Sequence, residues 1–153
     1  MSGSWRSMTP CFVRSPSRSP VDRIRVTIEP RWLTETTLLA MHAQQVERFG
    51  GAHGVLDQNV VLSALARPQQ RCSYDESADL ADFTAAYLVG FARSQGFNDG
   101  NKRTGLACAL VFLALNGVAL HVNGAELYAI TMKVATNPAG DVDVAAFLRE
   151  RLP

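Results

Sequence analysis

The sequence predicts an all-α domain, a bundle of five to six short helices around a central buried helix. Apolar residues recur at helical spacing through most of the chain after residue 33. Capping residues and turns containing Gly, Pro or Asn divide this pattern into short segments with short connections. The segment 101–115 is apolar on nearly every side, which indicates that it is the central helix.

The first 23 residues differ in composition from the rest of the chain. Residues 14–20 are rich in Ser, Pro and Arg and offer little apolar surface to bury. This composition predicts a flexible N-terminal tail, residues 1–23, ahead of a single folded domain, residues 24–153. At the start of that domain apolar and polar residues alternate from Ile24 to Ile28, which indicates a short extended segment.

Two helices are expected between residues 34 and 68. Thr34 can cap the first helix, and Gly50 with the glycine after it ends that helix. Asp57 can cap the second helix, which should stop before Pro68 because proline breaks a helix interior, leaving a loop after it. The inward face of the first helix is expected to carry Leu38, His42, Val46 and Phe49.

The second half of the chain predicts three or four further elements. A third helix should run from about residue 78 to residue 94, and a polar turn at 95–100 leads into the helix 101–115. Residues 118–122 indicate a short strand. Asn123 with Glu126 resembles a capping box for a helix to about residue 135. After a turn at 137–140, a last short helix is expected at 143–151.

The overall composition excludes several classes of protein. The formal net charge is +1, whereas a nucleic-acid-binding domain usually carries a strongly basic patch, so no direct nucleic-acid partner is expected. The longest apolar run, 106–115, is too short to span a bilayer, and no signal peptide is recognisable. Cys11, Cys72 and Cys108 are odd in number and far apart, which indicates neither a disulfide framework nor a zinc site and favours the cytoplasm.

Residues 95–103 carry the main chemical signal. Free backbone N–H groups and the helix dipole at the start of helix 101–115 would attract an anion, and Gly100 allows the backbone to approach it closely. Asn101 can cap this helix, and Lys102 and Arg103 add two cations in its first turn. Asp99 is a hard oxygen ligand suited to Mg²⁺, which typically uses one or two carboxylates together with substrate phosphates. A capped helix with a basic first turn is also common without any ligand, so the turn by itself does not decide between the two interpretations.

The run QGFNDGNKRT at 95–104 resembles the signature of the Fic/Doc family, and similarity to its Doc branch extends over about residues 33–152. The resemblance implies the all-α Fic fold and transfer of part of a nucleoside triphosphate to a protein hydroxyl. Doc toxins are protein kinases that modify elongation factor Tu and are neutralised by an antitoxin. By motif position Asp99 would bind Mg²⁺. The residues that would contact ATP are Phe97, Gly100, Asn101, Lys102 and Arg103. Asp99, Lys102 and Arg103 would also act in catalysis.

The sequence departs from the family signature at the catalytic position. Gln95 stands where the family has the histidine that acts as general base. A glutamine amide does not accept a proton near neutral pH, and loss of general-base help costs about 10²–10⁴-fold in rate. The sequence therefore predicts a Doc-like phosphotransferase toxin impaired by Gln95. The alternatives are a Fic-fold pseudoenzyme that binds a nucleotide or an antitoxin without catalysis, and a nucleotidyl (AMP) transferase. Leu106 disfavours the latter, because nucleotidyl-transferring members often carry an arginine there.

Overall fold

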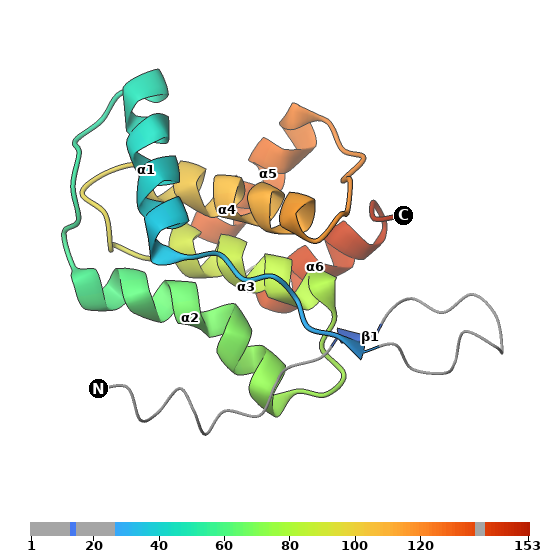
Figure 1. Cartoon of the computed structure of the whole chain (residues 1–153). Coiled ribbons are helices and arrows are strands. Elements are labelled where there is room, and N and C mark those ends of the chain that lie inside the picture. Colours follow the sequence, from blue (N-terminus) through green and yellow to red (C-terminus); the bar gives the residue numbers. More distant parts are fainter. Residues whose placement is uncertain (1–12, 15–26, 137–139) are drawn as a thin grey trace, which may run out of the picture.

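The computed structural model describes residues 13–14, 27–136 and 140–153, and within these ranges the chain forms a helical bundle with one minimal strand pair (Figure 1). The predicted all-α fold is confirmed. Strand β1 (Val13–Arg14) pairs antiparallel with β2 (Thr27–Ile28), which is the end of the predicted extended segment. Apart from β1, the predicted flexible tail 1–23 lies outside the described residues. The helices are α1 (Glu35–Phe49), α2 (Gln58–Tyr74), α3 (Leu80–Ala92), α4 (Asn101–Leu115), α5 (Gly124–Thr136) and α6 (Asp141–Arg149).

Helix α1 has the predicted ends. The side chain of Thr34 accepts a hydrogen bond from the backbone N–H of Thr37, which satisfies one of the unpaired amides of the first turn. Gly50 ends the helix with φ +82°, and its N–H donates to the carbonyl of Val46. Three of the four predicted inward residues are buried. Phe49 is 62% exposed, so its predicted burial is wrong.

Helix α2 begins after its predicted cap, Asp57, but it continues through Pro68 to Tyr74. The predicted stop and the loop after it are therefore wrong. A proline inside a helix removes one backbone hydrogen bond, and α2 changes direction near its middle (Figure 1). Contacts beyond the proline compensate for this loss, because Cys72 is buried and Arg71 forms an ion pair with the Asp82 carboxylate at 3.4 Å. Cys72 is also disulfide-bonded, a bond that the odd number and wide spacing of the cysteines did not indicate.

Helix α3 is the central buried helix of the bundle. It contacts α2, α4, α5 and α6, and nearly all of its residues are buried. The sequence pointed to residues 101–115 instead, but α4 leaves Leu110 and Leu115 partly exposed. The alanines of α3 let neighbouring helices approach from several sides. At Gly105 of α4, an added Cβ would lie 3.0 Å from the carbonyl oxygen of Leu88 and 3.1 Å from the amide nitrogen of Ala92. The α3 and α4 backbones are therefore nearly in contact.

The side chains around α3 form two hydrophobic clusters. The first joins α3 to α1, α2 and α4 and is rich in aromatic rings, whereas the second joins α3 to α4, α5 and α6 and is mainly aliphatic. Trp32 stacks on Phe112 at 5.7 Å between ring centroids and meets Phe83 edge-on at 5.3 Å, which covers the end of the first cluster. Because α3 belongs to both clusters, the loop at its C-terminal end starts from a rigid position.

The segment between α4 and α5 is not the predicted strand. Val118 donates its N–H to the carbonyl of Leu113, and residues 118–122 pair with no strand in the described part of the chain. Asn123 does cap α5, because its side chain accepts the N–H of Glu126 at 2.8 Å. The carboxylate of Glu126 bonds to Arg151 rather than to the cap residue.

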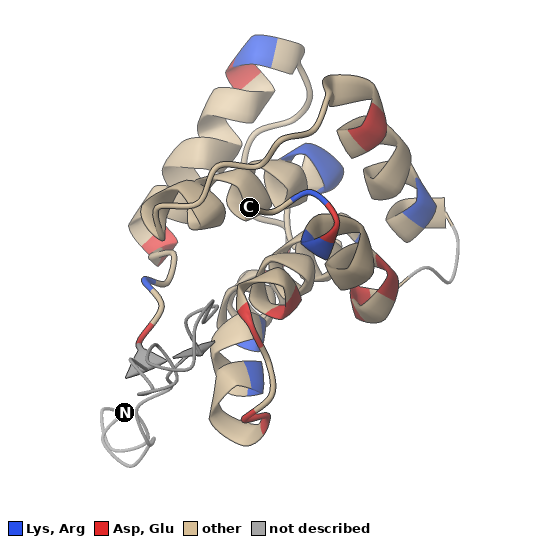
Figure 2. Cartoon of the chain, turned by 90° about the vertical axis from the view of Figure 1, so that its right-hand side faces the viewer, with Lys and Arg blue, Asp and Glu red and all other residues tan. Residues whose placement is uncertain are grey.

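Helix α6 begins at Asp141, two residues before the predicted start, and is attached to the bundle by ion pairs. Asp141 accepts two hydrogen bonds from Arg67 of α2, each 2.9 Å long. Arg149 pairs with Asp82 at 2.9 Å and with Asp79, the N-cap of α3, at 3.1 Å. Acidic and basic residues are interspersed along the helices on this side of the molecule (Figure 2). No helix among the described residues combines the length and the apolar character needed to cross a bilayer.

Candidate functional site

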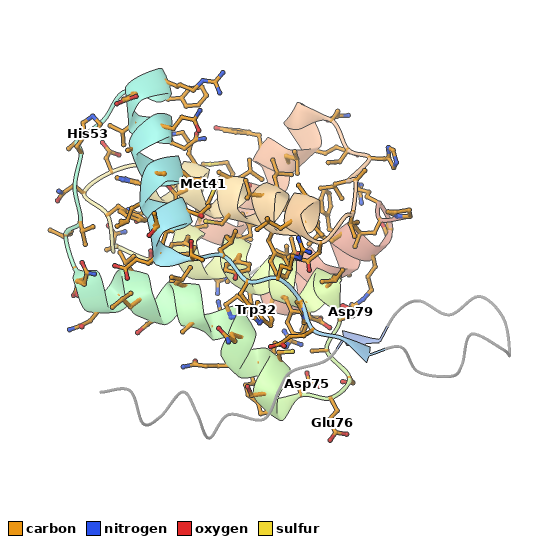
Figure 3. All side chains as sticks on the ribbon, viewed as in Figure 1. Trp32, Met41, His53, Asp75, Glu76 and Asp79 are labelled. Carbon is orange, nitrogen blue, oxygen red and sulfur yellow. The ribbon has the colours of Figure 1, made fainter. Side chains whose placement is uncertain are left out.

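The loop between α3 and α4 is held by the connection between α1 and α2. Figure 1 shows the two segments side by side, and an isolated antiparallel bridge joins Val55 to Phe97. The carbonyl of Gly96 accepts the N–H groups of Leu56 and Asp57 at 2.8 and 3.0 Å. The carbonyl of His53, which lies exposed on this connection (Figure 3), accepts the side-chain amide of Asn98. The loop conformation is therefore fixed largely by backbone atoms from a distant part of the sequence.

Phe97 and His42 attach the loop to the hydrophobic core. The Phe97 side chain is completely buried, and the ring of His42 stacks on it with 3.8 Å between centroids. His42 is 4% exposed, and its Nε2 lies 2.7 Å from the carbonyl oxygen of Asp99, to which it can donate. This arrangement agrees with the interpretation of His42 as a buried structural histidine. It also fixes the backbone at Asp99 from helix α1.

Asn101 closes the loop instead of capping the helix. Its Oδ1 accepts the N–H of Phe97 at 3.0 Å, and its Nδ2 donates to the carbonyl of Phe97 at 3.1 Å. The N-cap residue is Gly100, which has φ +76° and no side chain, so the predicted capping role of Asn101 is wrong. A left-handed conformation of this kind favours glycine. The tight turn places the first residues of α4 directly against the loop.

The backbone amides at the start of α4 are available to a ligand. After the N–H of the N-cap residue Gly100, the next amide that donates within the fold is that of Thr104, to the carbonyl of Gly100 at 2.9 Å. The N–H groups of Asn101, Lys102 and Arg103 have no hydrogen-bond acceptor among the described residues. Unpaired amides at a helix N-terminus, together with the helix dipole, form an anion-binding site. The structure therefore has the geometry on which the sequence interpretation depended.

The carboxylate of Asp99 lies between Gly100 and the α1–α2 connection, and Asp99 lines the same cleft as these amides. Its Oδ1 accepts the N–H of Gly100 at 3.0 Å, and its Oδ2 lies 3.4 Å from the N–H of Ala52. Each oxygen retains a lone pair, so the group fits Mg²⁺, which needs only one or two carboxylates when phosphates supply further oxygens. Among the described residues no cluster of three or more His, Cys, Asp or Glu side chains could hold a metal by itself. Oxygens of the ligand and water would therefore complete the coordination of a Mg²⁺ ion held by Asp99.

The two cations of the motif differ in their surroundings. Lys102 is exposed at the rim of the site. Arg103 donates from Nη2 to the carbonyl of Gly50 at 3.1 Å, and its guanidinium lies 5.4 Å from the centre of the Phe49 ring. This cation–π contact uses the exposed ring of Phe49 and ties the end of α1 to the start of α4. The Gly50 and Phe49 contacts of Arg103 were not foreseen from the sequence.

These groups line a cleft of about 370 Å³. The motif forms one wall with Gln95, Asp99, Gly100 and the first turn of α4, whereas Phe97 lies buried beneath and does not line the cleft. Helix α5 forms the facing wall, which the sequence analysis missed. Its spacing gave a usable signal, since an aromatic residue, a threonine and a methionine stand at positions i, i+3 and i+4 of one helix. The α5 residues that line the cleft are Tyr128, Thr131 and Met132.

The chain is thus an all-α domain in which unpaired amides, a carboxylate and two cations line one cleft. The family model described as Fic/DOC family matches residues 32–113. The chain is 39% identical over 119 residues to the protein kinase doc of Escherichia phage P1, a match that covers 78% of this chain and 94% of that relative. It is 44% identical over 73 residues to the toxin Doc of Mycolicibacterium smegmatis, covering 47% of this chain and 56% of that relative.

The chain belongs to the Fic/Doc family. Of the residues that carry the family signature, Phe97 is buried beneath the loop, whereas Gln95 and residues 98–103 line the cleft.

Proposed function

We propose that this protein is a Doc-like toxin that binds ATP with Mg²⁺ in the cleft and transfers the terminal phosphate to a hydroxyl group of a protein. The unpaired amides of Asn101, Lys102 and Arg103, which open into the cleft, carry this proposal. The names of the two relatives support the choice of a kinase and a toxin. By this proposal the target is a translation factor such as elongation factor Tu, an antitoxin protein is the neutralising partner, and the protein acts in the cytoplasm.

Each group of the site has a defined part in this reaction. The amides and the Lys102 ammonium would bind phosphate oxygens, which removes the penalty of placing cations at the positive end of the helix dipole. Asp99 would hold Mg²⁺, and a bound Mg²⁺ supplies neutralisation of charge between neighbouring phosphates. The bonds of the Asp99 backbone and side chain to His42, Gly100 and Ala52 would keep its carboxylate oriented before any ligand arrives.

Gln95 limits the rate in this proposal. It is exposed on the cleft rim, where a general base would have to reach the attacking hydroxyl. A glutamine amide can donate or accept a hydrogen bond but does not remove the proton. The other groups of the site remain, so nucleotide binding is expected to persist while turnover is about 10²–10⁴-fold slower than with a histidine.

The test is to restore the base and follow the label. The Gln95→His variant is incubated with elongation factor Tu and ATP labelled on the γ-phosphate, and the same variant is expressed in bacteria without an antitoxin. We expect label on the factor and growth arrest. The matched control carries Asp99→Asn in addition, which should abolish both. Absence of label and of growth arrest in Gln95→His would refute the assignment as a kinase toxin.

Gln95 itself favours a second candidate, a pseudoenzyme that binds a nucleotide or an antitoxin without catalysis. Calorimetric titration with Mg-ATP, combined with the label-transfer assay, separates the two candidates. The pseudoenzyme is expected to bind Mg-ATP tightly and to transfer no label even after Gln95→His. A nucleotidyl transferase would instead label the target from the α-phosphate of ATP and not from the γ-phosphate. Both labels are therefore used in parallel reactions.

A further inference from the structure

A second groove lies between α2 and the C-terminal half of α3. Its volume is about 540 Å³, compared with about 370 Å³ for the cleft. The floor of the groove is formed by Ala64, Val89 and Gly90, of which the first two are buried. A Cβ added to Gly90 would lie 3.7 Å from the Cβ of Ala64, so the absence of a side chain at Gly90 keeps the floor open. The proposed function leaves this groove unused.

One wall of the groove is a polar face of α2. The α2 side chains with polar groups that line it stand three or four positions apart, which places them on one side of the helix: Asn59, Ser63, Arg67 and Gln70. A helix rises about 1.5 Å per residue, so this face is about 16 Å long, which is the length of about five residues of extended chain. The groove therefore has the dimensions for a peptide segment rather than for a compact ion.

The charged groups that line the groove are guanidinium groups. Arg67 binds both carboxylate oxygens of Asp141 through Nη2 at 2.9 Å, while its Nη1 would lie 3.6 Å from a Cβ on Gly90. Arg93 stands nearer the motif, and its Nε donates to the carbonyl of Val134 at 3.1 Å. Among the described residues that line the groove there is no carboxylate. Charge complementarity therefore favours a segment with acidic side chains.

The groove adjoins the cleft at Ser94. This residue lines both cavities, and Gln95, which occupies the family's catalytic position, follows it and lines the cleft. The start of α2 is packed tightly against the loop here, because a Cβ added to Gly96 would lie 2.7 Å from a methyl group of Val61. A peptide that lies in the groove would therefore reach the place where the attacking hydroxyl is expected.

We propose that the groove between α2 and α3 binds an extended, acidic segment of the target protein, next to the hydroxyl that receives the phosphate. This proposal rests on the proposed function, because it takes the cleft to be the site of transfer to a protein. Carboxylates of the segment would pair with Arg67 and Arg93. The side-chain amides of Asn59 and Gln70 can both donate and accept, so they would bind the backbone of the segment.

The first test measures peptide binding without any reaction. One peptide of about seven residues carries a threonine followed by alternating glycine and glutamate, and a second peptide has lysine in place of each glutamate. Amide chemical shifts of the full, isotope-labelled chain are followed by NMR. We expect the glutamate peptide to cause saturable shifts at Ser63 and Gly90, and the lysine peptide to cause none. Equal shifts with both peptides, or none with either, would refute an acidic docking groove.

Substitutions at Ser63 test the role of charge, because its side chain makes no hydrogen bond within the described residues. Ser63→Glu should weaken the glutamate peptide at least about fivefold, the effect of a like charge about 4 Å away in water, whereas Ser63→Lys should preserve or strengthen binding. Ser73→Glu is the matched control, since Ser73 is exposed on the same helix and lines neither cavity. It should leave the affinity unchanged.

The second test measures label transfer from ATP to elongation factor Tu by the Gln95→His chain, with and without Ser63→Glu. We expect the KM for the factor to rise about fivefold, with kcat and the calorimetric affinity for Mg-ATP unchanged. If label is transferred but Ser63→Glu leaves this KM unaltered, the groove is refuted and the proposed function stands. If the glutamate peptide binds the groove but no label is transferred, the proposed function fails and the groove stands as a site for acidic peptides.

Discussion

Replacing Gly51 by alanine is expected to disturb the site from a residue outside the motif. Gly51 has φ +114°, a conformation that residues with a side chain rarely adopt, and an added Cβ would lie 2.9 Å from Oδ2 of Asp99. Ordinary contact begins at 3.4 Å, so the carboxylate would have to move by about half an ångström. The substitution therefore combines backbone strain with displacement of the proposed Mg²⁺ ligand.

Gly50 provides a control that isolates the second effect. It has φ +82°, and a Cβ placed on it would meet nothing within 4 Å. Backbone strain of this kind costs about 1–3 kcal/mol, which corresponds to a fall in Tm of about 2–4 °C for each kcal/mol in a chain of this size. Gly50→Ala and Gly51→Ala should therefore lose similar amounts of free energy of unfolding from strain, and only Gly51→Ala should move Asp99.

The assay combines urea unfolding with calorimetric titration of ATP in the presence and absence of Mg²⁺. We expect Gly51→Ala to reduce the gain in ATP affinity that Mg²⁺ provides by about tenfold, the lower end of the effect of disturbing the support of a metal ligand. Gly50→Ala should leave that gain intact. If the two variants retain the same Mg²⁺ dependence, Asp99 does not hold the metal in the way that we infer.

Three further predictions concern the loop, the ion pairs and the buried thiol. Asn101→Ala removes both hydrogen bonds to Phe97 and should lower the free energy of unfolding by about 1–3 kcal/mol in urea titrations, whereas an equal stability in both proteins would contradict the closing role. Burial alone would raise the pKa of Asp79, but hydrogen bonds led by that from Arg149 lower it below 3.8. The stability that Asp79 contributes is thus fully present above pH 3.8 and is lost as the pH falls through the lower folded pKa, so Asp79→Asn should flatten this acid limb of the unfolding free energy. Burial raises the pKa of Cys108 to about 12, so its thiol should resist iodoacetamide at neutral pH until the chain is unfolded; rapid labelling of the native protein, detected by mass spectrometry, would contradict its burial.

Local signals in the sequence were sufficient to locate most helix ends. Thr34, Asp57 and Asn123 cap helices as predicted. A short polar side chain at the N-cap accepts hydrogen bonds from the N–H groups of the first turn, so this interaction depends only on neighbouring residues. The continuation of α2 past Pro68 depends on Arg71 and its ion pairs with other helices. Local helix propensity takes no account of those contacts, so the sequence predicted that the helix ends before Pro68.

Identification of the central helix failed for a related reason. A helix that is apolar on every side is expected to be buried on every side. Residues 101–115 are apolar nearly all round, but Leu110 and Leu115 on this helix are exposed. Helix α3 is instead enclosed because its small residues admit close neighbours, an effect that depends on which helices meet. At the site, the motif predicted the head of α4, but the contact of Arg103 with Phe49 and the α5 wall require knowledge of which helices face each other.

The close approach at Gly105 has a consequence for motion. Helices that nearly touch along their backbones cannot slide past one another without steric clashes, so α3 and α4 should behave as one rigid body. The phosphate-binding turn at the head of α4 is therefore expected to keep its position relative to α3 when a ligand enters the cleft.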